Sequence, residues 1–147
     1  MAVFAMIQQN SNNNRKFTLD EIKLAHSKVK SGADFPSYIQ ELKKLGVNSY
    51  EHFLIDGHIN YYGENGYYLI GDAKWPIREV AAKSQLVDFA KNLKTHQAGK
   101  SDYLTFCKEA IDLGIEKWIV DLEKMTCTYY NLDKVEVLVE EIRSSIK

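Results

Sequence analysis

Residues 34–62 read DFPSYIQELKKLGVNSYEHFLIDGHINYY, and within this stretch a helical pattern gives way to a strand pattern. Asp34 is expected to cap the helix, Ile39 and Leu42 recur at the spacing of one helix face, and Gly46 follows as a C-terminal stop. After the glycine the pattern becomes strand-like, and an Asp-Gly dipeptide marks a tight hairpin turn. The stretch therefore predicts a helix that leads into antiparallel strands.

The segments on either side extend the same plan. Thr18 and Glu21 form a capping box in front of an amphipathic helix over residues 18–31. Downstream, the strand-like pattern continues to position 71 and is divided by a second hairpin dipeptide, Asn65-Gly66. The first half of the chain is therefore expected to contain two helices followed by three short strands.

The second half of the chain repeats this order. Ser84 and Ser101 are expected to cap two more helices, because each precedes an apolar stripe at helical spacing. The two stripes are Leu86, Phe89, Leu93 and Leu104, Cys107, Ala110, Ile111. Three further strands are expected at residues 115–122, 125–130 and 135–142.

A shift of 68 residues aligns the two halves. It places Leu45-Gly46 on Leu113-Gly114 and Tyr61-Tyr62 on Tyr129-Tyr130. Two unrelated segments with generic helix caps are the alternative, but a Tyr-Tyr pair and a Leu-Gly stop in one register favour duplication of an ααβββ unit. We therefore expect an α+β fold in which four helices pack on an antiparallel β-sheet, with repeats at about 17–71 and 84–142.

Length and composition fit one globular domain. The chain has 147 residues, of which 45% are hydrophobic and 27% charged, so it can bury a sizeable core and is not expected to be disordered. The Asn-rich start, residues 1–14, is expected to be a flexible leader, and residues 15–147 are expected to form the domain. Each half alone would be marginally stable at its size, which favours one shared core.

Four stretches between Phe17 and Tyr130 carry a family resemblance: FTLDEIKLAHSKVKSGADFPSYIQELKKLGV, DGHINYYG, HQAGKSDYLTFC and GIEKWIVDLEKMTCTYY. They are similar to the YbcV-like family of small bacterial and prophage proteins, often labelled "phage envelope protein". The resemblance runs from about Phe17 to Ile142. It implies an α+β domain of bacterial or phage origin, and it brings no established activity and no catalytic residues to carry over.

Charge and cysteine content restrict the classes of binding partner and the cellular compartment that we expect. The chain has 19 Lys and Arg against 20 Asp and Glu, whereas nucleic-acid and anionic-membrane binders usually carry a basic excess, so neither partner is expected. No stretch approaches the roughly 20 apolar residues of a membrane span, and the apolar N-terminal run is too short for a signal peptide. Cys107 and Cys127 are expected to be reduced, buried thiols in a cytoplasmic protein, with one disulfide as the alternative.

No motif for catalysis, metal binding or cofactor binding occurs in the sequence, so we expect no metal and no cofactor, and the absence favours a protein that is not an enzyme. Cys107 lies among apolar neighbours, which would leave its thiol protonated and inert. His52 shares strand parity with core positions, so a hydrogen-bonded core histidine is expected. Asp121 and Glu123 could form an acid–base pair, although solvated charges at a strand end are the simpler interpretation.

One set of polar and aromatic residues forms a candidate binding surface. In the strand over residues 57–63, alternation separates Ile59 and Tyr61 on one face from a polar row on the other. The equivalent strand of the second half carries a matching outward row. The two rows together are His58, Asn60, Tyr62, Thr126, Thr128 and Tyr130. If the helices cover the other face, these six residues line the open face of the sheet, although an ordinary solvated face is the alternative.

Three functions follow from this surface. The preferred hypothesis is a non-catalytic binding or accessory protein that holds a protein or small-molecule partner on the face around His58, Tyr62 and Tyr130. The second is an enzyme with a cryptic site, in which His58 acts as acid or base with help from Asp56 or a tyrosine hydroxyl. The third is a homodimer in which this face is the subunit interface.

Overall fold

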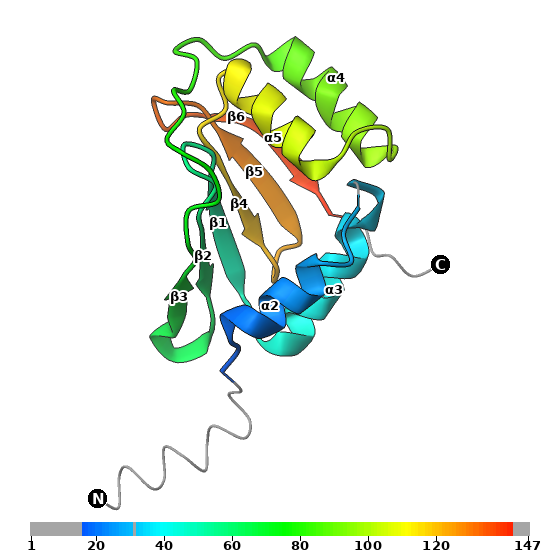
Figure 1. The fold of residues 1–147 in the computed structure, drawn as a ribbon, viewed down its shortest axis with the longest axis vertical. Helices are drawn as coiled ribbons and strands as arrows, with labels where there is room; N and C mark the ends of the chain where they lie inside the picture. Colours follow the sequence, from blue (N-terminus) through cyan, green and yellow to red (C-terminus); the bar gives the residue numbers. More distant parts are fainter. Residues whose placement is uncertain (1–15, 31, 143–147) are drawn as a thin grey trace, which may run out of the picture.

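The computed structural model describes residues 16–30 and 32–142, and the expected leader at residues 1–14 lies outside them. Within these ranges the chain forms α-helices, short 3-10 helices (η) and β-strands, which confirms the α+β class (Figure 1). In chain order the elements are α2 (Leu19–His26), η1 (Gly32–Asp34), α3 (Phe35–Leu45), β1 (Ser49–Phe53), β2 (Ile59–Tyr62), η2 (Glu64–Gly66), β3 (Tyr68–Ile70), α4 (Leu86–Gln97), α5 (Tyr103–Asp112), β4 (Lys117–Asp121), β5 (Thr126–Tyr130) and β6 (Glu136–Glu141).

The strands form one six-stranded antiparallel sheet in the order β3-β2-β1-β4-β5-β6. Each half of the chain contributes three neighbouring strands, and the halves join where β1 pairs with β4 and Glu51 lies opposite Ile119. Ser49 lies opposite Tyr62 in the first hairpin, and Lys117 lies opposite Tyr130 in the second. The sheet is therefore continuous across the two halves of the sequence.

The four α-helices of the described ranges lie on one face of the sheet as two pairs, α2 with α3 and α4 with α5 (Figure 1). Burial alternates along β1, β2, β4 and β5, so every second side chain points to the helices. These inward residues are Tyr50, His52, Ile59, Tyr61, Trp118, Val120, Cys127 and Tyr129. The outward residues on the same strands are only partly buried, as expected for a sheet with one covered face.

The expected caps of the third and fourth helices are wrong by one residue. Gln85 rather than Ser84 precedes α4, and it makes no side-chain cap. Asp102 rather than Ser101 caps α5, because its carboxylate accepts the Thr105 N–H at 2.8 Å, and an ionised acceptor bonds more strongly than a hydroxyl.

The first two helices also differ from expectation. The capping box of Thr18 and Glu21 is formed, but α2 ends at His26 instead of continuing to residue 31. Its last turn tightens, because the Val29 N–H bonds to the His26 carbonyl three residues earlier. Asp34 precedes α3 as expected, but its side chain makes no cap bond to the helix and accepts the N–H of Lys30 at 2.9 Å instead.

Two leucines expected in the core stripes are exposed. Leu86 is 43% exposed and Leu104 is 57% exposed. Both lie in the first turn of their helices, and one turn later the buried face begins, with Phe89 in α4 and Cys107 in α5. Helical periodicity thus identified the buried faces, but it placed their starts too early.

The segment between β3 and α4 packs closely against both halves. The Trp75 indole N–H donates to the Leu54 carbonyl at 2.9 Å, which holds the segment against the end of β1. Further along, the backbone runs so close to Gly114 that a methyl group there would lie 2.5 Å from the Cα of Ser84. Gly114 also has a φ of +91°, so this position favours glycine for two separate reasons.

Two further observations concern membranes and thiols. Across residues 16–30 and 32–142, no helix combines the length and the apolar composition needed to cross a bilayer. Cys107 and Cys127 are free and buried, so the expectation of buried thiols is confirmed and the alternative disulfide is not formed.

Candidate functional site

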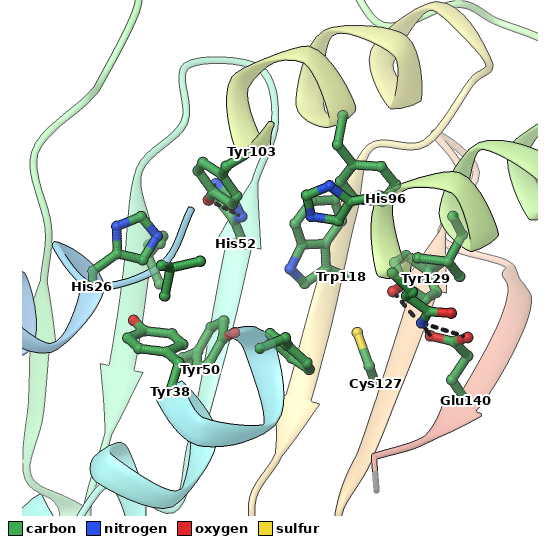
Figure 2. A pocket seen from close by; sticks show the side chains of 16 residues that line it. His26, Tyr38, Tyr50, His52, His96, Tyr103, Trp118, Cys127, Tyr129 and Glu140 are labelled. Carbon is green, nitrogen blue, oxygen red and sulfur yellow. Dashed lines mark hydrogen bonds between the residues drawn. The ribbon is translucent and has the colours of Figure 1, made fainter. Parts of the chain in front are cut away.

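A central pocket lies between the two helix pairs and the middle of the sheet (Figure 2). Its walls combine residues from α2, α3, α4 and α5 with inward residues of the strands. The side chains that matter most are His26, Tyr38, Tyr50, His52, His96, Tyr103, Trp118, Cys127, Tyr129 and Glu140. The pocket has a volume of about 70 Å³, about half of the roughly 150 Å³ cavity that holds benzene in another protein.

Aromatic packing fixes the walls of the pocket. The His52 ring stacks on Tyr103 at 5.7 Å between centroids and meets Trp118 edge to face at 4.7 Å. Trp118 in turn lies 5.6 Å from the Tyr129 ring. His52 is 1% exposed and lies 3.0 Å from the Tyr103 hydroxyl, which confirms the expectation of a hydrogen-bonded core histidine. Such mutual contacts hold the rings in place before any ligand arrives.

Burial keeps the three pocket histidines uncharged at neutral pH. It lowers the pKa of His52 well below the ordinary value, and the positive charge of Lys74 lowers it further. Burial also lowers the pKa of His26 and of His96, with Lys74 adding to the effect at His26. The Nδ1 of His96 lies 3.1 Å from the Ser101 carbonyl, which can only accept, so the proton is on Nδ1 and Nε2 remains an acceptor.

Among the described residues that line the pocket, Tyr38 has a buried hydroxyl that makes no well-formed hydrogen bond. Tyr38 is 5% exposed, and its buried oxygen has no hydrogen-bond partner among the described residues. The Tyr61 hydroxyl is close enough for its charge and a weak hydrogen bond to raise the pKa of Tyr38, but the pair lies outside the distance and angle limits of a well-formed hydrogen bond. Burial raises that pKa well above the ordinary value, so the group stays protonated. An unsatisfied buried hydroxyl costs about 1–3 kcal/mol.

Glu140 lies at the mouth of the pocket. Its carboxylate accepts two hydrogen bonds from the Gln97 amide at 3.1 and 3.0 Å and one from the Tyr129 hydroxyl at 3.4 Å. Phe35, Gln97 and Glu140 also line an outer hollow, which Ile142 helps to form. A ligand could therefore enter from the outer hollow past this carboxylate.

The candidate nucleophiles and the candidate acid–base pair are unsuited to catalysis. Burial raises the pKa of Cys107 and of Cys127 to about 12, so both thiols stay protonated, as the sequence predicted for Cys107. Asp121 accepts the backbone N–H groups of Glu123 and Lys124, each at 2.9 Å, which makes it a turn residue rather than half of a carboxylate pair. Within the described part of the chain, no cluster of three or more His, Cys, Asp or Glu side chains could hold a metal.

The six residues predicted as a binding surface lie on the other face of the sheet, and none of them lines the central pocket. His58 has an acidic partner, because its Nδ1 lies 2.6 Å from the Asp56 carboxylate, and its ring stacks on Phe53 at 4.6 Å. Asn60 lies one row further along β2, where its buried amide oxygen has no hydrogen-bond partner among the described residues. Thr126 and Thr128 follow on β5.

Tyr62 and Tyr130 of this open face meet at an ion pair that sequence reasoning missed. Lys117 lies 2.7 Å from Glu51, and both side chains are largely buried. Tyr62 donates to the Glu51 carboxylate at 3.3 Å, and the Lys117 ammonium lies 5.4 Å from the centroid of the Tyr130 ring. The parity of Glu51 and Lys117 in their strands was visible in the sequence, but their pairing depended on how β1 and β4 align.

Comparison with known proteins assigns the chain to a family. A family model described as "Protein of unknown function (DUF1398)" matches residues 23–141. The chain belongs to this family. Uncharacterized proteins of Mycobacterium tuberculosis and Mycobacterium bovis, named Rv2012 and Mb2035, are 29% identical to this DUF1398 protein over 101 residues. That alignment covers 67% of this chain and 60% of each relative, so the chain spans about 60% of the length of the curated relatives it matches.

Sequence reasoning did not find the central pocket of this DUF1398 protein. Tyr50, Trp118 and Tyr129 are all buried and line this pocket. The available signal was the number of buried side chains that end in a polar group. Four tyrosines and three histidines surround this pocket, whereas an ordinary hydrophobic core consists mainly of apolar side chains.

Proposed function

We propose that this DUF1398 protein is a non-catalytic binding protein whose ligand is a small ring-containing molecule held in the central pocket. The carrying observation is the buried Tyr38 hydroxyl on the wall of an aromatic space, which makes no well-formed hydrogen bond to any of the described residues. Buried polar groups in native proteins are almost always paired, so each exception calls for an explanation. A ligand atom that bonds to this hydroxyl would supply the missing partner.

The rest of the lining supports this proposal. Small-molecule sites are typically concave and aromatic, with a few polar groups that fix the orientation of the ligand. Here Tyr38 and Glu140 supply such groups, and Trp118 and Tyr50 supply flat walls. Binding rather than catalysis is favoured for two reasons. The thiol of Cys127 is protonated, and His52 and His96 bond to neutral groups, the Tyr103 hydroxyl and the Ser101 carbonyl.

The proposal can be checked with single-ring compounds such as phenol, added to the ¹⁵N-labelled full-length protein. We expect the indole N–H signal of Trp118 to move, whereas that of Trp75, which is bonded to a backbone carbonyl, should move less. Tyr38→Phe should weaken phenol binding about tenfold, which is roughly 1.4 kcal/mol. Tyr67→Phe is the matched control, because the Tyr67 hydroxyl bonds to the Phe17 carbonyl and does not line the pocket. Failure of every single-ring compound to move the Trp118 signal at millimolar concentration would refute the proposal.

A second candidate function uses the open face of the sheet to bind a protein partner. It is supported by the ordered contacts that Asp56 makes with His58 and that Lys117 makes beside Tyr130. Replacing His58 and Tyr130 by Ala should abolish such binding and leave the fold intact, and unchanged binding would exclude this face. Sedimentation at several concentrations would reveal the alternative, a homodimer. The enzymatic version is weaker, because His58 has an acidic partner but does not line the central pocket.

We also propose that the domain arose by duplication of an ααβββ unit, and the strand registers support this. Adding 68 to both members of the pair Ser49–Tyr62 gives Lys117–Tyr130, which is the observed register of the second hairpin. Adding 68 to Glu51 gives 119, and Ile119 is its observed partner across the centre of the sheet. We further propose a phage or prophage origin, which the family resemblance supports. We propose a cytoplasmic location because the two cysteines are buried and form no disulfide.

A further inference from the structure

The charge of the pocket lining has one sign. With its histidines neutral, Glu140 is the only charged side chain among the described residues that line the pocket. Its recorded partners, Gln97 and Tyr129, are neutral donors, and no Lys or Arg of the described ranges pairs with it. An ionised carboxylate can accept about four hydrogen bonds, and those from a cation are the strongest. Glu140 therefore favours a positively charged group at the mouth of the pocket.

The opposite end of the pocket disfavours a positive charge. Figure 2 shows His26 and Glu140 at opposite sides of the space. The charge of Lys74 lowers the pKa of His26 and of His52, so its field reaches this end. Beyond His26, a neighbouring hollow is lined by Lys23 and Lys74 with a single carboxylate, whereas the hollow beyond Glu140 carries two carboxylates and no described cation. A cationic ligand would thus be oriented with its charge toward Glu140.

The middle of the pocket suits one aromatic ring. Trp118, Tyr50 and Tyr129 present ring faces and edges at the distances at which aromatic pairs are favourable. The same rings attract a nearby ammonium group through their electron-rich faces. The pocket volume of about 70 Å³ is smaller than the roughly 150 Å³ cavity that holds benzene in another protein, so a bound ring with a short side chain must move wall side chains or extend into the outer hollow beside Glu140.

We infer that the ligand is a small aromatic amine, bound with its ring against Trp118 and its ammonium group directed to Glu140. The inference rests on the proposed function of the central pocket, and it adds the chemical class and the orientation of the ligand. Tyr38 would hydrogen-bond to a polar substituent of the ligand or to a water that the ligand retains.

Three compounds of nearly equal shape separate charge from ring binding: 2-phenylethylamine, 2-phenylethanol and phenylacetate. Isothermal titration calorimetry on the full-length protein at pH 7.5 should give the tightest binding for the amine, about tenfold tighter than the alcohol, and the weakest for the carboxylate. Equal or tighter binding of the alcohol or the carboxylate would overturn the inference and leave the proposed function standing. Failure of all three compounds to bind would overturn the inference together with the proposed function.

The variant Glu140→Gln tests the residue itself. It should reduce the affinity of 2-phenylethylamine about tenfold and leave that of 2-phenylethanol within about twofold, so the alcohol also reports whether the pocket of the variant is intact. Glu136→Gln is the matched control, because Glu136 lies on the same strand, is exposed and does not line the pocket. An equal loss of amine affinity in both variants, or no loss in Glu140→Gln, would contradict the assigned role of Glu140.

Discussion

Removing the Tyr38 hydroxyl should make the ligand-free protein more stable. The oxygen is buried and makes no well-formed hydrogen bond within residues 16–30 and 32–142, and such a group costs about 1–3 kcal/mol relative to a paired one. Tyr38→Phe deletes only that oxygen and keeps the ring contacts with His26 at 5.2 Å and Tyr50 at 6.4 Å. We therefore expect the free energy of unfolding to rise by about 1–2 kcal/mol, which is about 3–6 °C in Tm for a domain of this size.

The matched variant Tyr67→Phe should have the opposite effect. The Tyr67 hydroxyl donates to the Phe17 carbonyl at 2.7 Å, so its removal leaves that carbonyl without this bond. A typical hydrogen bond contributes about 0.5–1.5 kcal/mol, and the free energy of unfolding should fall by that amount. The opposite signs make the comparison informative, since both variants lose the same atom.

Both variants can be measured by urea unfolding of ligand-free protein, followed by circular dichroism and extrapolated linearly to water. If Tyr38→Phe destabilises the protein as much as Tyr67→Phe does, then the Tyr38 hydroxyl has a partner, such as Tyr61 or a bound water, and the central argument for a ligand fails. If the Tyr38→Phe variant is more stable and also loses affinity for ring compounds, then the Tyr38 hydroxyl lowers stability while it contributes to binding.

Three further outcomes follow from the structure. In urea titrations, Gly114→Ala should lower the free energy of unfolding by about 1–3 kcal/mol more than Gly66→Ala does. Both glycines have a positive φ, but only Gly114 is packed against backbone atoms, so equal losses would contradict this packing. Cys107 and Cys127 should react with a thiol reagent at neutral pH only in denaturant, since burial raises the pKa of each to about 12, and rapid labelling of the native protein would show that they are accessible. As the pH falls below about 6.5, the unfolded state binds protons that the buried histidines His26, His52 and His96 resist, so the free energy of unfolding should fall by up to about 1.4 kcal/mol per pH unit for each histidine. Urea titrations from pH 5 to 8 should show this loss, and His52→Gln should reduce it.

The strands were predictable because their signals are local. A period of two places Ile59 and Tyr61 on one face and His58 on the other, whatever the rest of the chain does. Hairpin dipeptides such as Asn65-Gly66 carry the positive φ angles that a tight turn requires, and both residues adopt them. Parity and turns together were sufficient for the class of the fold and for the inward position of most core side chains.

Helix starts were less predictable, because several residues compete for the same role. Ser101 and Asp102 are both good caps, and the choice between them depends on the exact turn at which the chain meets the sheet. Leu104 satisfies the helical period, yet it lies one turn before the face that the sheet covers. Periodicity gives the direction of the apolar face, and only packing decides which of its residues are buried.

By itself, the sequence determined an α+β domain, the two faces of each main strand and the inert character of the Cys107 thiol. Only the tertiary structure decided that Tyr38 and Glu140, far apart in the chain, line the same space. The physical reason is that the pocket is enclosed by side chains from both helix pairs and from the sheet, and no local pattern encodes the volume left between them. The same holds for the pairing of Glu51 with Lys117, which depends on the register between the two halves. Local periodicity fixes where a side chain points, whereas the packing of distant elements fixes what it meets.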